Sequence, residues 1–396
     1  MDRHADTAYG RLRTCHIACE SEPIAMRALT WICLFCASTT ALADDAVVPA
    51  SGVVPAPAGD AATGSPPHPT ERACRASADR SRALRLRRAL EAGFGVQYWG
   101  ERYTAQGLAD QPHGLLIMEG TKVGAPYSDT GREVFFTPEE IAMITHDGER
   151  PALGYLNVGE IEDHRDYWVE MSTRRDQAEA FVPPEWLGPR TAHGDHLSAY
   201  WTPAWRHVML ARVDRLMALG VDGLFLDDVL HYYTHATDKG LSWPEPGRPE
   251  GPQDAPGLAL AMMELVLAIA ERVRTWDCNA LVIVNNGVFI GRDAGEPPGH
   301  DGSRPAFAAY LDAIDGLLVE NALSSADHPD TRAALKEDFL DSGLPILTVD
   351  AVALTGGHDT AAQQQRVAEE ARRSGFVPYV VEDTGFNRLW APTTRP

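Results

Sequence analysis

Eight short apolar runs of strand length recur between residues 94 and 383, and stretches with the apolar spacing of helices separate several of them. Parallel strands need a long crossover, usually a helix, because a tight turn joins only antiparallel neighbours. The alternation therefore predicts a parallel sheet, and eight strands are the number that closes a (β/α)8, or TIM, barrel. The predicted strands are residues 94–99, 114–119, 153–160, 223–228, 281–286, 316–321, 346–350 and 377–383.

Four stretches between these runs carry apolar residues at helical spacing. The other α/β fold, a doubly wound open sheet, needs a glycine-rich phosphate-binding loop after an early strand, and the sequence contains none there. The sequence therefore predicts the barrel. The predicted helices are residues 203–219, 256–276, 330–341 and 360–374.

The first 43 residues have the pattern of a secretory signal peptide that starts at Met26. Arg27 precedes an apolar core over residues 28–37, and small residues up to Ala43 form a cleavage site. This core is shorter than the roughly 20 residues that span a bilayer, so we expect no membrane span after cleavage. The pattern predicts a secreted or periplasmic protein.

Residues 44–72 are rich in Pro, Ala and Gly and predict a flexible linker, because they offer too little apolar surface to fold. Residues 73–396 then form a single catalytic domain. Cleavage would leave Cys74 and Cys278, which either pair in the oxidising compartment or stay separate as buried thiols.

The formal net charge is −21 at pH 7, and removal of residues 1–43 does not change it. Such a charge repels nucleic acids and other anionic polymers and attracts a cationic partner. We therefore expect no nucleic-acid binding.

Polar residues stand where the predicted strands end. In the run "GLFLDD" the apolar strand stops at Asp227 and Asp228. The carboxyl ends of barrel strands form the active face, so acids and amides there point to chemistry rather than packing. The other strand ends contribute Glu160, Asn285, Asn286, Glu320, Asn321, Asp350, Glu382 and Asp383.

Acids gathered with aromatic rings suit a carbohydrate, because rings stack on sugar faces while two carboxyl groups supply an acid and a nucleophile or base. The same oxygens could instead bind calcium or magnesium. No CxxC and no HExxH adjoins the strand ends, so zinc is not expected, and His231 and His235 are interpreted as loop or rim residues. The aromatic residues expected at the bowl are Tyr98, Trp99, Tyr155, Tyr232 and Tyr233.

Four sequence blocks carry a family resemblance: "YLNVGEIEDHRDYW" from Tyr155, "GVDGLFLDDVLHY" from Gly220, "IDGLLVENAL" from Ile314 and "ILTVDAV" from Ile346. Together, and in this order, they resemble the endo-α-1,4-polygalactosaminidases of glycoside hydrolase family 114. The resemblance covers residues 94–389, nearly the whole predicted domain.

The resemblance implies a barrel that cleaves α-1,4-linked galactosamine polymers, which are cationic, with two carboxyl groups, with retention, and without a cofactor or metal. It makes Asp227 the nucleophile and Glu320 the general acid and base. Where the family often has two adjacent acids on the sixth strand, this chain has Glu320 followed by Asn321. The predicted substrate-binding residues are Tyr98, Tyr155, Asn157, Glu160, Glu162, Asn285 and Asp350.

Strand alternation separates the two aspartates of the fourth strand. Phe225 and Asp227 lie on one face, whereas Asp228 lies on the other with Leu224 and Leu226. Asp228 is therefore expected to cap the next loop or to form an ion pair rather than to share the role of Asp227.

The segment from residue 163 to 201 is long for a barrel loop, and such loops are usually functional or disordered. Its aromatic residues Trp186, Tyr200 and Trp201 are either sugar platforms or the loop's own small core.

Two other functions remain compatible with the sequence. A barrel that binds polysaccharide without cleaving it would keep the aromatic residues, because a fold does not determine an activity. A metal-dependent hydrolase would use the same acids. A chitinase is disfavoured, because Phe225 and Val229 replace acids of its DGxDxDxE pattern.

Overall fold

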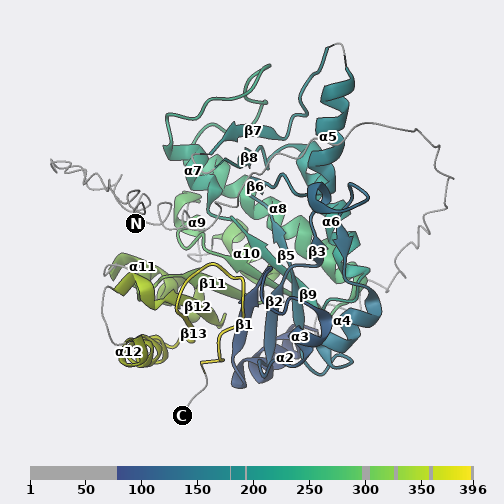
Figure 1. Ribbon diagram of the computed structural model, residues 1–396. Helices are drawn as coiled ribbons and strands as arrows, with labels where there is room; N and C mark the ends of the chain where they lie inside the picture. Colours follow the sequence, from purple (N-terminus) through teal and green to yellow (C-terminus); the bar gives the residue numbers. More distant parts are fainter. Residues whose placement is uncertain are drawn as a thin grey trace, which may run out of the picture. The chain divides into compact units, whose positions relative to one another are not determined.

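The computed structural model describes residues 78–178, 180–191, 194–296, 304–324, 329–355 and 360–393. Eight parallel strands form one sheet, and all eight predicted strands are confirmed (Figure 1). In spatial order they are β1 (Phe94–Gln97), β2 (Leu115–Met118), β5 (Ala152–Asn157), β9 (Gly223–Asp227), β10 (Leu281–Asn285), β11 (Gly316–Glu320), β12 (Ile346–Ala351) and β13 (Val377–Val381).

The sheet curls into a nearly closed (β/α)8 barrel, as predicted. Within the described residues no ladder pair joins β13 to β1, but side chains and the segment after β13 fill this seam. The rings of Phe94 and Tyr379 lie 5.4 Å apart, and the Tyr98 amide donates to the carbonyl of Phe386 over 2.8 Å.

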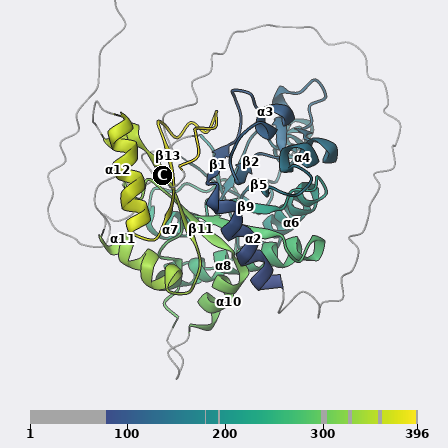
Figure 2. The ribbon, with the colours of Figure 1, turned by 90° about the horizontal axis from the view of Figure 1, so that it is seen from below.

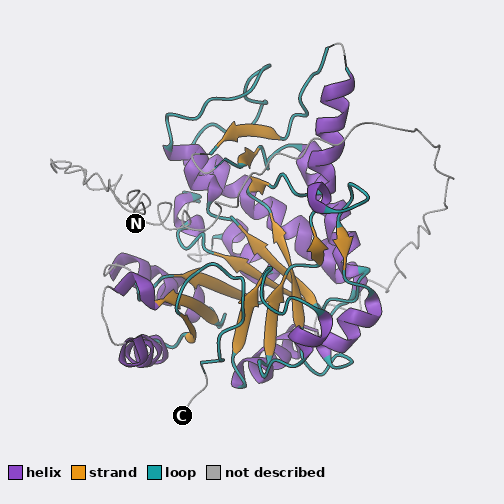
Figure 3. Ribbon diagram, viewed as in Figure 1, coloured by secondary structure: helices purple, strands orange, loops and turns teal. Residues whose placement is uncertain are grey.

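Helices surround the strands (Figures 2 and 3). The four predicted helices are confirmed as α6 (Pro203–Met217), α8 (Ala255–Trp276), α11 (Pro329–Ala334) with the π-helical turn η2 (Leu335–Leu340), and α12 (Thr360–Arg373). The remaining helices were not predicted: α2 (Ala78–Glu91), α3 (Ala105–Ala109), α4 (Pro138–Thr145), α5 (Asp166–Gln177), α7 (His231–Thr237), α9 (Ile290–Asp293), α10 (Pro305–Ala313), η1 (Ala125–Tyr127) and η3 (Val352–Thr355).

Local sequence explains where the two crossover helices on either side of β9 begin. Thr202 accepts a hydrogen bond from the Trp205 amide and is followed by proline at the first helical position of α6. Asp254 accepts from the Gly257 amide and starts α8 in the same way. These caps satisfy amide groups that have no partner inside the helix.

The barrel interior is filled by alternate residues of the strands, among them Phe94, Tyr155, Phe225, Ile283 and Val349. The opposite faces of the strands are covered by helices, so the strands are buried on both sides and read as continuous apolar runs. Because Phe225 points inward, Asp227 two residues later points into the carboxyl end of the barrel.

Two small antiparallel sheets, not predicted, are built by the segments that follow β2 and β5. Their strands are only two to four residues long, too short for a periodic pattern. One pairs β3 (Thr121–Val123) with β4 (Val134–Phe135), and the other has the order β6 (Glu160–Ile161), β8 (His196–Ser198) and β7 (Leu187–Arg190).

The long segment after β5 has a core of its own. Trp186 is buried against Trp205 and Tyr167, with ring centres 5.8 and 5.9 Å away. Tyr200 is also buried and donates a hydrogen bond to the Leu258 carbonyl. Of the two interpretations of these aromatic residues, the structure supports the loop core for Trp186 and Tyr200.

The predicted signal peptide, the linker and Cys74 lie outside the described residues. Cys278 is disulfide-bonded. Among the helices that the structure describes, none combines the length and apolar character needed to cross a bilayer.

The barrel core generates a stability prediction. Phe225→Ala removes a buried ring and should lower the free energy of unfolding by about 3–5 kcal/mol. Leu84→Ala on the exposed face of α2 should change it by less than about 0.5 kcal/mol. Guanidinium unfolding followed by circular dichroism measures both variants, and equal effects would contradict the interior position of Phe225.

Candidate active site

The neighbouring strands β9, β10 and β11 bring Asp227, Asn285 and Glu320 side by side at the carboxyl end of the barrel. All three side chains are buried. The amide nitrogen of Asn285 donates to Asp227 Oδ1 over 2.7 Å and to Glu320 Oε1 over 2.8 Å. One amide group therefore links the two predicted catalytic acids.

Each of these strands turns sharply at the next residue. Asp228, Asn286 and Asn321 have φ angles of 59°, 57° and 53°, in the left-handed region that Asp and Asn tolerate better than most residues. The turn lets the amide of Asp228 donate to Asp227 Oδ1 over 2.8 Å. In the sequence these three turns are marked by adjacent polar residues, Asp227-Asp228, Asn285-Asn286 and Glu320-Asn321.

The two acids are held differently. Asp227 accepts three hydrogen bonds, from Asn285, from the Asp228 amide, and from the Tyr155 hydroxyl at 2.8 Å to Oδ2. Glu320 accepts only the one from Asn285 among the side-chain contacts that the structure describes. Donors stabilise the ionised form of a carboxyl group, so Asp227 is the better stabilised anion.

Burial raises the pKa of both carboxyl groups. For Asp227 the hydrogen bonds from Asn285 and Tyr155 oppose this rise. For Glu320, burial and then the charge of Asp227 raise the pKa to about 8, against one opposing hydrogen bond. A pKa of about 8 keeps the proton on Glu320 at neutral pH, and the three donors make Asp227 the member of the pair that ionises more readily.

Asn157 at the end of β5 joins a second acidic group to this pair. Its amide nitrogen donates to Asp228 Oδ2 over 2.6 Å, and its Oδ1 accepts from the Glu160 amide over 2.7 Å. His231 Nε2 lies 3.1 Å from Glu160 Oε1 and 3.4 Å from Asp228 Oδ1. Both carboxyl groups are partly exposed.

Asp228 Oδ1 lies 3.4 Å from His231 Nε2, within ion-pair distance, but the expectation that strand alternation would take Asp228 away from Asp227 is wrong. Alternation holds only while the backbone stays extended, and Asp228 has left the strand with a positive φ. Its carboxylate therefore returns to the rim next to Asp227.

Tyr98 and Tyr155 form an aromatic wall beside the acids, with ring centres 4.5 Å apart. Burial, and then the charges of Asp227 and Glu320, raise the pKa of Tyr98. Trp99 is 53% exposed. Tyr232 is a correction to the expected bowl, because its ring is buried and its hydroxyl donates to Asp293 over 2.7 Å.

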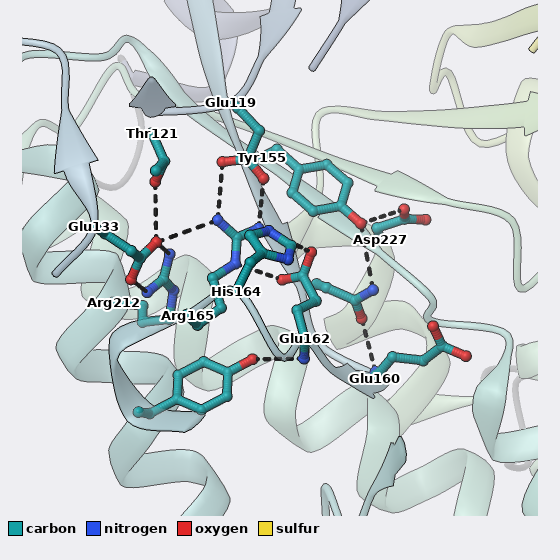
Figure 4. Close-up of polar contacts among 12 residues, drawn as sticks. Glu119, Thr121, Glu133, Tyr155, Glu160, Glu162, His164, Arg165, Arg212 and Asp227 are labelled. Atoms are coloured by element: carbon teal, nitrogen blue, oxygen red, sulfur yellow. Dashed lines mark hydrogen bonds and ion pairs between the residues drawn. The ribbon is translucent and has the colours of Figure 1, made fainter. Parts of the chain in front are cut away.

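Glu162 lies in a buried ion-pair network next to the wall (Figure 4). Its oxygens accept from Arg165 over 2.7 and 2.9 Å. Arg165 is 1% exposed and also contacts Glu119 and Glu133, and Arg212 donates to Glu133 over 2.7 Å. Burial opposes ionisation of Glu162, but the charge of Arg165 prevails and lowers its pKa.

Asp350 lies beneath the rim. It is 0% exposed, and its Oδ1 accepts from the amides of Leu323 and Ser324 over 2.7 and 2.9 Å. These contacts hold the loop that follows β11 and Glu320. Direct contact with a substrate is still a prediction for this residue.

In the part of the chain that the structure describes, two groups of side chains have the atoms to hold a metal ion, with ligand atoms within 4.8 Å of one another. In the group Glu119, Glu162 and His164, the two carboxylates already bind Arg165. The group Glu160, Asp228 and His231 has no arginine or lysine ion pair among the described residues. The second group is the better candidate for a cation.

No protein-family model matches this chain. It is 27% identical over 304 residues to an uncharacterized protein of Deinococcus radiodurans, covering 72% of this chain and 80% of the relative. It is 28% identical over 266 residues to an uncharacterized protein of Thermotoga maritima, covering 64% and 72%.

Among solved structures, the chain is similar to Aspergillus fumigatus Ega3 in complex with galactosamine. The TM-score is 0.50 at 13% sequence identity, over 76% of this chain and 96% of Ega3. At this identity the similarity establishes the fold, the barrel that the strand order already shows.

The buried proton of Glu320 generates a prediction about stability and pH. Because the folded protein keeps this proton up to about pH 8 and the unfolded chain releases it near pH 4.5, folding takes up a proton in that window. The free energy of unfolding therefore falls as pH rises. Glutamine does not titrate, so the free energy of unfolding of Glu320→Gln does not fall in this way. Relative to the parent it should therefore rise from pH 5 to pH 8, by at most about 1.4 kcal/mol per pH unit.

Urea unfolding at pH 5, 6.5 and 8 measures this difference, with Glu149→Gln on the exposed loop after α4 as the matched control. A constant difference between Glu320→Gln and the parent at all three pH values would contradict the raised pKa.

Proposed function

We propose that this protein is a secreted or periplasmic glycoside hydrolase that cleaves an α-1,4-linked galactosamine-type polysaccharide with Asp227 and Glu320. The proposal rests on how these two carboxyl groups are arranged. Two buried carboxyl groups share one amide at the carboxyl end of a barrel, and only one of them is surrounded by donors. Such a pair separates an ionised nucleophile from a protonated acid.

In the proposed reaction Asp227 attacks the anomeric carbon while Glu320 donates its proton to the glycosidic oxygen. The carbon–oxygen bond to the leaving sugar breaks, and a glycosyl ester forms on Asp227. Glu320, now ionised, takes a proton from water, whose oxygen attacks the same carbon and releases Asp227. The proton on Glu320 is then restored, and the net reaction consumes one water.

The spacing supports retention. Asp227 Oδ1 and Glu320 Oε1 both bind the Asn285 nitrogen, so they lie no further apart than the sum of 2.7 and 2.8 Å. Retaining enzymes hold their carboxyl groups about 5–5.5 Å apart, whereas inverting enzymes need roughly 6.5–9.5 Å to admit a water molecule.

A cationic amino sugar fits the charges around the pair. Glu160 presents a partly exposed carboxylate beside the pair, where an ammonium group on the neighbouring sugar carbon could bind. Such a cation would also favour ionisation of Asp228, because burial and the charges of Asp227 and Glu160 raise the pKa of that carboxyl group well above its ordinary value. The net charge of −21 attracts a polycation to the surface. Ega3, which shares the fold, was solved with galactosamine, and this supports the substrate class.

The test is hydrolysis of purified galactosamine polysaccharides by the parent, Asp227→Asn and Glu320→Gln, with products identified by mass spectrometry. Both variants should lose activity, Glu320→Gln by roughly 10²–10⁴-fold in kcat. On an aryl glycoside, whose leaving group needs no proton, Glu320→Gln should regain much of its rate while Asp227→Asn should not. Glu149→Gln is the control that keeps full activity.

Activity that survives both substitutions would move the chemistry elsewhere on the rim. Binding of the polymer without product from the parent would instead support a non-catalytic polysaccharide-binding barrel.

A metal-dependent hydrolase is the second candidate, because Glu160, Asp228 and His231 could together hold a cation. The carboxyl-pair mechanism needs no metal, so we expect kcat to be unchanged, within about twofold, after dialysis against EDTA. Loss of activity that zinc or calcium restores would favour the metal-dependent reaction, and Glu160→Gln should then abolish the restoration.

A further inference from the structure

A C-terminal strap, residues 384–393, crosses the seam between β13 and β1 and lies next to the site (Figure 1, in yellow). The amide of Tyr98 donates to the Phe386 carbonyl over 2.8 Å, and the amide of Glu101 donates to the Asn387 carbonyl over 2.7 Å. The side chain of Gln97 also donates to the Asn387 carbonyl, over 3.1 Å. The strap thus binds the backbone immediately around Tyr98.

Phe386 has a backbone conformation that its side chain disfavours. Its φ angle is 45°, where a bulky residue other than glycine is unusual, and its side chain is only 8% exposed. The neighbouring contacts hold it there, since Asp383 accepts from the Gly385 amide and the Trp390 amide donates to the Tyr379 hydroxyl. Strained residues that persist in this way cluster at functional sites.

The ring of Phe386 continues the aromatic wall of the site. Its centre lies 5.3 Å from that of Tyr98, which lies 4.5 Å from that of Tyr155. The Tyr155 hydroxyl then donates to Asp227. Phe386, Tyr98 and Tyr155 therefore form one packed row that ends at the proposed nucleophile.

Tyr98 is the member of this row with an available hydroxyl. Within the described residues no protein group hydrogen-bonds to this hydroxyl, and its oxygen is not fully buried. The charges of Asp227 and Glu320 act on this phenol and, after burial, raise its pKa, so it stays a donor beside both acids.

We propose that Phe386 is a positioning residue that acts through Tyr98. By holding the Tyr98 ring against Tyr155, it places the Tyr98 hydroxyl where the sugar meets the acid pair. The role rests on the proposed hydrolase function. Through Phe386 alone, the C-terminal strap supports the active site as well as sealing the barrel seam.

The test is a double-mutant cycle with Phe386→Leu, Tyr98→Phe and the double variant, assayed for kcat and KM on the galactosamine polymer. Phe386→Leu should lower kcat about tenfold in the parent but less than about twofold in the Tyr98→Phe background, because it acts through the hydroxyl that is then missing. Arg388→Ala, in the same strap and on the Trp390 ring, is the control expected to keep kcat.

Phe386→Gly serves if Phe386→Leu does not fold, because glycine removes the ring and accepts the positive φ. Equal losses in both backgrounds, or no loss in either, would overturn the proposal.

A second readout is independent of activity. In protein labelled with 3-fluorotyrosine, the fluorine signal of Tyr98, assigned by its absence in Tyr98→Phe, should move in Phe386→Leu and stay in place in Arg388→Ala. An unmoved signal would overturn the positioning role even in an active enzyme. If the parent shows no hydrolase activity, the proposed reaction is refuted. A Tyr98 signal that still moves in Phe386→Leu would then support the contact between Phe386 and Tyr98 independently of that reaction.

Discussion

The parallel pairing of β9 with β10, and of β10 with β11, is the constraint on which the site depends. Val284 pairs with Leu226, and Asn285 pairs with Leu318, two residues before Glu320, so the three side chains of the site lie on the inward face of neighbouring strands. Only then can the single amide of Asn285 reach Asp227 on one side and Glu320 on the other. A shift of one residue in either pairing would turn these side chains away from the barrel axis.

The barrel tolerates this concentration of acids because their environments differ. Around Glu162 the buried negative charges are balanced by two arginines. Arg165 and Arg212 together bind Glu119, Glu133 and Glu162. Around Glu320 there is no such cation among the described side chains, and the group holds its proton instead. Burial of a charge is expensive unless it is paired, so the two regions represent two solutions to the same problem.

Sequence patterns located the eight strands well, because strands buried on both faces leave long apolar runs. The short strands β3, β4, β6, β7 and β8 were missed because two to four residues carry no recognisable period. The positions of Asp227 and Glu320 at strand ends predicted that they lie at the rim, and the family resemblance singled them out as the expected catalytic pair. The place of Asp228 was not predicted, because alternation along a strand gives no information about the left-handed turn that follows it.

The sequence by itself determined the barrel and the set of polar residues at its carboxyl rim, since both follow from which residues are apolar and where each strand stops. The tertiary structure alone decided the relations among those residues: the amide shared by two acids, the arginine that binds Glu162, and the contact of Phe386 with Tyr98 across 288 positions of the chain, the difference between 386 and 98. The physical reason is that hydrogen bonding, desolvation and charge depend on distances between segments that are remote in sequence, and only the folded barrel fixes those distances.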